Sequence, residues 1–181
     1  MPTNFDMAGI KIAALLLPFL LAPTLASPTG SPRHATFTLS NINYNSSMIY
    51  STPAHLAVSE GYIDFDLENS AVPYTAHCSA YSSRGFGFFF GDQVYQCTVP
   101  AGSASFTFSQ PDGVFNVNET WTQEHGHRSQ DYLGTGSGSI TLDCSTVVYT
   151  NPNWTIGDIY STTTETCQPG ELTIKPTVVR V

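Results

Sequence analysis

The fold is decided by one stretch, Tyr74–Phe108, which reads YTAHCSAYSSRGFGFFFGDQVYQCTVPAGSASFTF. Cys78 and Cys97 bracket two strand-like pieces within it, and the alternating segment Ala104–Phe108 follows at once. Alternation of apolar and polar residues is typical of a half-buried β-strand. We therefore predict a hairpin that a disulfide between Cys78 and Cys97 closes.

Alternating segments continue on both sides of this stretch, and turn-forming sequences such as Pro111-Asp-Gly113 separate them. No segment has a sustained helical period, and we find no internal repeat and no interdomain linker. Short strands between marked turns predict one all-β domain over residues 36–181, a compact antiparallel β-barrel or sandwich. The expected strands are 36–40, 62–67, 74–81, 94–97, 104–108, 114–121, 139–144, 154–160 and 171–174, and the expected turns or loops are 41–47 and 122–131.

The first 26 residues have the three-part plan of a secretory signal peptide. Lys11 precedes a compact apolar run, Ile12–Ala22, and small residues before Ser27 suit cleavage there. The run is about a dozen residues long, whereas a membrane-spanning helix needs roughly 20. Asp6 weakens the positive end of the leader, so an uncleaved anchor is the less favoured alternative. We predict a signal peptide over 1–26, a flexible lead over 27–35, and secretion to the extracellular space.

The chain is acidic and poor in charge, with six Lys and Arg, 14 Asp and Glu, and a net charge of −8. Asp6 and Lys11 cancel, so removal of the leader leaves that charge unchanged. Such a chain argues against nucleic acid and against anionic membranes as partners. Charged residues make up 11% and aromatic residues 12% of the sequence. This composition suits an extracellular β protein better than a helical cytosolic one.

Four cysteines follow the leader: Cys78, Cys97, Cys144 and Cys167. An even number in a secreted chain implies two disulfides. Three pairings are possible, and we favour Cys78 with Cys97 and Cys144 with Cys167 because each closes a short local loop. Loops of this length stabilise by roughly 3 kcal/mol each in the chain-entropy model. Zinc is a poor alternative because the chain has no CxxC pair.

Three asparagines, Asn45, Asn118 and Asn153, stand in the N-x-Ser/Thr pattern of glycosylation acceptors. The pattern is common by chance, but the leader would bring all three into the secretory route. We expect a glycoprotein with at least one of them used, and each of the three side chains to face solvent.

The motifs around the cysteines follow a definite order. The first part of the pattern contains Cys78-Ser79-Ala80, then Tyr95-Gln-Cys97, and then Phe106-Thr-Phe108 ahead of the Pro-Asp-Gly turn. The second part contains Asn116-Val-Asn-Glu-Thr-Trp121, which precedes a Gly-rich strand into Leu142-Asp-Cys144. This order resembles the Alternaria alternata allergen 1 family of secreted fungal proteins over roughly residues 37–174.

The resemblance implies a compact β-barrel whose disulfides join the first cysteine to the second and the third to the fourth. It also implies an allergen or plant-defence elicitor, since some members bind thaumatin-like plant proteins or flavonoid-type ligands. The dimer-linking cysteine of the founding allergen has no counterpart between Ser27 and His77. A disulfide-linked dimer, and a ligand site at such an interface, are therefore not implied.

The best metal-like cluster is Glu124, His125 and His127, with Asp131 nearby. Residues two apart on a strand point the same way, so the two histidines could bind one cation. The simpler interpretation is a polar loop, because the spacing fixes no third ligand. We expect no metal and no cofactor.

Catalytic residues are not indicated by the sequence. Asp64, Asp66 and other carboxylates are plentiful, but Asp64 and Asp66 lie on the outer face of one expected strand, whereas a glycosidase needs two across a cleft. Gly134-Thr-Gly-Ser-Gly138 is neither a serine-hydrolase elbow nor a nucleotide-binding loop, because no matching strand–helix context surrounds it.

The aromatic run Phe86-Gly-Phe88-Phe89-Phe90 is the strongest apolar feature. Strand alternation cannot bury every phenylalanine, so we consider a binding surface formed by Phe86, Phe88, Phe89 and Phe90. A core strand covered by a loop is the alternative.

Taken together, we expect a secreted, non-enzymatic fungal protein, allergen-like or effector-like, that binds an extracellular protein, with plant defence proteins as candidates. A small-ligand or glycan-binding β-barrel module is the alternative. A secreted hydrolase is a third hypothesis, and it requires a cleft with converging carboxylates of shifted pKa.

Overall fold

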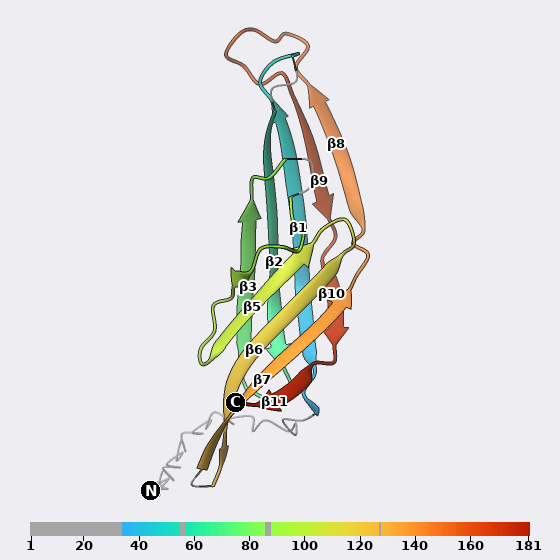
Figure 1. Cartoon of the computed structure of the whole chain (residues 1–181). Coiled ribbons are helices and arrows are strands. Elements are labelled where there is room, and N and C mark those ends of the chain that lie inside the picture. Colours follow the sequence, from blue (N-terminus) through green and yellow to red (C-terminus); the bar gives the residue numbers. More distant parts are fainter. Residues whose placement is uncertain (1–33, 55–56, 86–87, 127) are drawn as a thin grey trace, which may run out of the picture.

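The computed structural model describes residues 34–54, 57–85, 88–126 and 128–181, and these form an all-β molecule (Figure 1). The predicted signal peptide and residues 27–33 of the predicted lead lie outside the described residues. Within the described chain, no helix is long and apolar enough to cross a membrane.

Eleven strands make up the described fold. In chain order they are β1 (Phe37–Tyr50), β2 (Ala57–Asn69), β3 (Thr75–Ser82), β4 (Tyr95–Gln96), β5 (Ser103–Ser109), β6 (Val114–His125), β7 (Arg128–Ser139), β8 (Cys144–Thr150), β9 (Ser161–Cys167), β10 (Gly170–Ile174) and β11 (Thr177–Arg180).

The strands form two antiparallel sheets that pack face to face. The six-stranded sheet has the order β3-β2-β1-β9-β8, with β10 also paired to β1, and the five-stranded sheet has the order β11-β7-β6-β5-β4. The sheets do not close on each other, so the sandwich, one of the two expected architectures, is the observed one.

The core between the sheets is strongly aromatic. Phe65 of β2 meets Phe106 of β5 edge-on, with ring centroids 4.9 Å apart, and Phe108 stacks on Phe115 at 4.5 Å. The apolar residues of β2 that alternate with the outward Asp64 and Asp66 are all buried, namely Ile63, Phe65 and Leu67. Apolar side chains thus fill the interior of the sandwich.

The six-stranded sheet extends well beyond the five-stranded one. In Figure 1 the upper parts of β1, β2, β8 and β9 continue past the ends of β5, β6 and β7. This upper region, which we name the distal end, is a single layer of strands. The C terminus lies at the opposite end, where the backbone N–H of Val181 donates to the carbonyl oxygen of Asp131 at 3.1 Å.

The expected turn at 41–47 is wrong, because this Asn/Ser-rich segment continues β1. Asn41 adopts a φ of 54°, and the register with β2 shifts between Ser40 and Asn43. This bulge reverses which positions face inward, and it lets Tyr44 join the core. The segment stays extended because β2 pairs with it throughout, and β9 pairs with its second half from Asn45.

Three further expectations about elements are also wrong. Residues 122–125 and 128–131 belong to the long β6–β7 hairpin and not to a loop, since the pairing continues to His125 opposite Arg128. Residues 140–143 connect β7 to β8, and residues 154–160 form most of the loop between β8 and β9.

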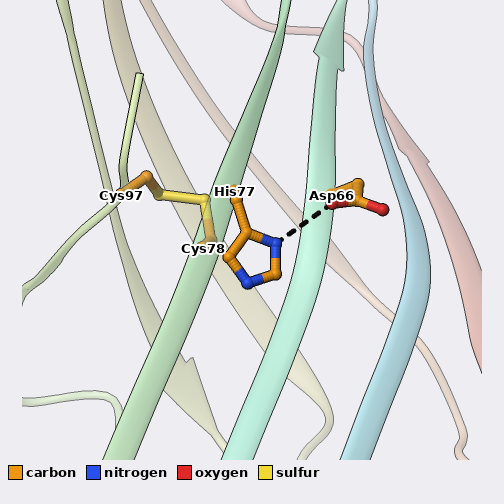
Figure 2. The surroundings of a disulfide bond; sticks show 4 residues. All are labelled: Asp66, His77, Cys78 and Cys97. Carbon is orange, nitrogen blue, oxygen red and sulfur yellow. Dashed lines mark hydrogen bonds and ion pairs between the residues drawn. A yellow bond between two sulfur atoms is a disulfide. The ribbon is translucent and has the colours of Figure 1, made fainter. Parts of the chain in front are cut away.

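Both predicted disulfides are confirmed. Cys78 of β3 is bonded to Cys97, which follows β4, so this bond joins the two sheets (Figure 2). Cys144 of β8 is bonded to Cys167 of β9 and joins two neighbouring strands of one sheet.

Candidate protein-binding surface

Exposed large apolar side chains gather at the distal end. Half of those on the described surface lie on β8, on the loop that follows it, or on the start of β2. They are Val58, Val147, Val148, Tyr149, Ile156 and Ile159. Exposed apolar side chains that gather in one region of a protein, unlike those scattered singly, indicate a candidate interaction site.

The loop 151–160, which we name the distal loop, is held by hydrogen bonds. The Trp154 indole Nε1–H donates to the carbonyl oxygens of Ser51 at 3.1 Å and Asp158 at 2.9 Å. The Asp158 carboxylate accepts from the Thr155 hydroxyl at 2.7 Å and from its backbone N–H at 3.2 Å. The polar groups of the loop are thus used inside it and against the end of β1.

The same hydrogen bonds leave the isoleucines of the distal loop facing water. Ile156 is 93% exposed, and Gly157 beside it has a φ of 108°, a conformation that favours glycine. Trp154 packs edge-on against Tyr160 with ring centroids 6.1 Å apart. An ordered loop that presents an apolar side chain to solvent is suited to insert it into a partner.

A concave site of about 430 Å³ lies beside this loop. Its lining is mainly apolar and comes from Ser51 and Thr52 after β1, and from Trp154, Ile156, Gly157, Asp158 and Ile159. This volume is within the range of small-molecule and side-chain pockets. The site could therefore receive an apolar side chain of another protein.

β8 forms the open edge of the distal end. It is the last strand of its sheet, and every one of its residues is exposed. The five-stranded sheet does not reach this far (Figure 1), and the side chains of successive β8 residues, which point to opposite faces, are all exposed.

The predicted aromatic surface is largely buried instead. Phe89 is 2% exposed and packs against Tyr44 and Tyr95, and Phe88 lies over Gly61, where a Cβ would come within 2.6 Å of it. Both side chains are buried, as the alternative expected, but the segment is irregular and does not form the core strand that the alternative described.

Phe90 is the exposed member of the described part of the run. Arg84 lies over its ring at 4.7 Å and donates to Asp92 at 2.6 Å. This bond, the main cause, lowers the pKa of Asp92. Phe86 lies outside the described residues.

The predicted metal-like cluster sits at the tip of the β6–β7 hairpin. Glu124 and Asp131 are both exposed, and Asp131 accepts a hydrogen bond from the Thr122 hydroxyl at 2.6 Å. His127 and the side chain of His125 lie outside the described residues. Among the described side chains, Cys144, Glu165 and Cys167 come close enough together to hold a metal, but the two cysteines are joined in a disulfide.

The outer-face carboxylates belong to a polar ladder across three strands. Asp66 accepts from Asn41 at 3.1 Å and lies 3.1 Å from Nδ1 of His77 (Figure 2). The bonds from His77 and then Asn41 lower the pKa of Asp66. Asp64 of the same strand accepts from Asn43. These carboxylates keep the outer face hydrated, as expected for Asp64 and Asp66.

One buried carboxyl group was missed in the sequence. Glu119 on β6 is 2% exposed, and burial, the largest effect, raises its pKa to about 7 although Asn69 lowers it. Strand alternation could have indicated its burial, because Glu119 stands between Val117 and Trp121 at the alternating inward positions of β6.

All three sequon asparagines, Asn45, Asn118 and Asn153, have exposed side chains. Asn45 lies on β1, Asn118 on β6, and Asn153 in the distal loop. The expectation of solvent-facing acceptors is met at each position, and their glycosylation stays a prediction.

A family model described as Alternaria alternata allergen 1 matches residues 33–167 of the chain. This range includes the distal loop, both disulfides and nine of the strands, β1 to β9. No curated protein and no solved structure matches the chain.

Proposed function

Because the chain belongs to the Alternaria alternata allergen 1 family, we propose that it is a secreted, non-enzymatic protein that binds an extracellular protein of a host through the distal loop. The paired cysteines suit the extracellular space, since disulfides persist in oxidising compartments. The acidic chain favours a partner surface that is neutral or basic.

One observation carries this proposal: a hydrogen-bonded loop holds Ile156 almost wholly in water beside an apolar concavity. A pre-ordered loop loses little conformational entropy on binding, so apolar contacts there contribute more of their free energy to affinity. An apolar anchor that fills a pocket near the centre of an interface supports binding, and a few such residues carry most of the binding energy.

The test is capture of partners from plant extracellular fluid by the immobilised protein, followed by binding of the purified partner. The double substitution Ile156→Asp and Ile159→Asp is expected to weaken that binding at least about tenfold, since buried charge without a partner is costly. Val94→Asp, at an exposed valine outside the distal loop, is the matched control and should bind as the natural chain does.

Two results would contradict the proposal. The first is that the fluid contains no protein that the natural chain retains. The second is that the Ile156 and Ile159 variant, with an unchanged melting temperature, binds the purified partner as tightly as the natural chain.

A second candidate function, glycan binding, is favoured by an aromatic pair on the outer face of the six-stranded sheet. Tyr62 and Tyr81 face each other across β2 and β3 with ring centroids 5.0 Å apart, and both are exposed. Exposed aromatic faces are surfaces on which sugar rings can stack. Ligand binding inside the fold is not favoured, because side chains fill the space between the sheets.

Glycan arrays distinguish this candidate. If it is correct, the natural chain binds a defined oligosaccharide and Tyr62→Ala with Tyr81→Ala abolishes the signal, while Ile156→Asp leaves it intact. Binding that survives loss of both tyrosines would remove the candidate.

A further inference from the structure

β8 is a sheet edge without the features that normally prevent strand pairing. The five-stranded sheet ends in short strands, β4 with two residues and β11 with four. The β3 edge is covered at His77, which exchanges backbone hydrogen bonds with Thr98 at 2.9 and 2.7 Å. β8, by contrast, has seven residues, and no described strand pairs with its outer side.

Natural edges are blunted by lysine, proline, bulges or covering segments. β8 reads CSTVVYT and contains neither lysine nor proline. Its register with β9 is continuous from Cys144 to Thr150, without a bulge. The strand is thus long, regular and rich in residues that favour β structure.

The hydrogen bonds that flank β8 show which of its backbone groups are free. Gln168 N–H donates to the Asp143 carbonyl oxygen, and Asn151 N–H donates to the Tyr160 carbonyl oxygen, both at 2.8 Å. In an antiparallel pair, the bonded positions alternate. Val147 and Tyr149 therefore bond to β9, whereas Thr146, Val148 and Thr150 direct their N–H and C=O groups to the open side.

The absence of charged residues along this edge indicates which kind of strand can pair with it. Residues 144–157 include no Asp, Glu, Lys, Arg or His, although the chain has a net charge of −8. Two acidic copies repel each other over most of their surfaces, and a neutral strand is the place where they can approach.

We propose that β8 pairs antiparallel with β8 of a second copy of this chain, about a two-fold axis at Val148. In this register Val148 lies opposite Val148 of the second copy, and Thr146 lies opposite Thr150, so the free backbone groups bond to each other. The six-stranded sheet then continues from one copy into the next. The pairing is non-covalent, because all four cysteines are already paired within the chain.

The same register matches side chains on one face of the strand. Val147 lies directly opposite Tyr149 of the second copy, at a non-bonded position where cross-strand side chains come closest. Pairs of an aromatic and a β-branched residue at such positions stabilise a sheet. Among the described strands, each copy has one such edge, so the assembly closes at two copies.

Charge pairs at these two positions test the register, because both side chains are exposed and their replacement leaves the core intact. Val147→Lys with Tyr149→Lys places like charges opposite each other, and Val147→Lys with Tyr149→Glu places opposite charges there. Sedimentation of the mature chain should show a concentration-dependent dimer for the natural sequence. The two-lysine variant should weaken dimerisation on the order of tenfold, and the lysine–glutamate variant should restore it.

Hydrogen exchange supplies a second measurement that does not depend on a variant. The amides of Thr146, Val148 and Thr150 should become protected as the concentration rises, and those of Val147 and Tyr149 should be protected at every concentration. Val94→Lys is the control substitution and should leave the dimer unchanged. A monomer at all concentrations, assembly beyond two copies, or equal dimerisation of both charge variants would overturn the proposal.

Discussion

At the scale of the residue, Gly134 on β7 shows how closely the two sheets approach. A Cβ at this position would lie 2.7 Å from Cζ of Phe37 and 2.9 Å from Cζ3 of Trp121, and both rings are buried. Gly134→Ala should therefore lower the free energy of unfolding by about 1–3 kcal/mol through overpacking. Chemical denaturation measures this, with Ser137→Ala on the exposed face of the same strand as control. Equal stability of the two variants would contradict the close packing.

The buried carboxyl group of Glu119 should make the stability of the fold depend on pH. Its pKa is about 7 in the folded chain and near the ordinary 4.5 in the unfolded chain. The folded state therefore keeps the proton between these values while the unfolded state loses it. Proton binding by Glu119 therefore adds to the free energy of unfolding, on the order of 3 kcal/mol. This contribution is complete below about pH 4.5 and is lost as the pH rises to about 7.

Glu119→Gln should remove this pH dependence and raise stability above about pH 7. Thermal unfolding on either side of this window, at about pH 4.5 and about pH 7.5, measures the difference between the natural chain and the variant. Glu124→Gln, with an exposed side chain on the same strand, is the control. A Glu119→Gln variant that loses as much stability with rising pH as the natural chain would sink the prediction.

Much of the residue-level picture could be predicted, and the failures have clear causes. The inward set Phe115, Val117 and Trp121 follows from strand alternation, whereas Glu119 was passed over because a carboxylate is rarely buried. Phe88 and Phe89 are adjacent and both buried because the segment is irregular and packs over Gly61. Period-two alternation therefore does not apply to them.

At the scale of the element, β8 depends on its disulfide. β9 is its only strand partner within the described chain, and none of its side chains is buried in the core. Replacing Cys144 and Cys167 by serine should cost roughly 3 kcal/mol through loop entropy. The loss should be local: amides of β8 and the distal loop should exchange faster, while those of β2 and β5 keep their protection.

The other disulfide supplies the comparison. Cys78 and Cys97 join the two sheets, so replacing both by serine should lower the midpoint of global unfolding. Uniform loss of protection in the Cys144 and Cys167 variant, or no change in β8, would contradict the assignment of a local role.

Sandwich strands such as β2 and β5 could be predicted, whereas β7 and β11 of the same sandwich, and β8 and β9 of the distal end, were not. β2 and β5 alternate because one face is in the core and the other in water. β8 and β9, which read CSTVVYT and STTTETC, lack this alternation because the distal end is a single layer with no deep core on either side. The candidate binding surface was missed for the same reason.

At the scale of the whole molecule, secretion can be checked on the chain itself. The protein purified from a fungal culture medium should begin at Ser27, which N-terminal sequencing determines. Treatment with an N-glycan-removing enzyme should lower its mass, since all three acceptor asparagines are exposed. A secreted chain that begins at Met1, or one without sugar, would contradict the respective prediction.

The opposed placement of the C terminus and the distal loop has a practical consequence. A tether at the C terminus would leave the distal loop, which follows β8, at the end that points into solution. Phage display, or an oriented sensor chip, can therefore screen variants of this loop for altered recognition without the anchor blocking access to it.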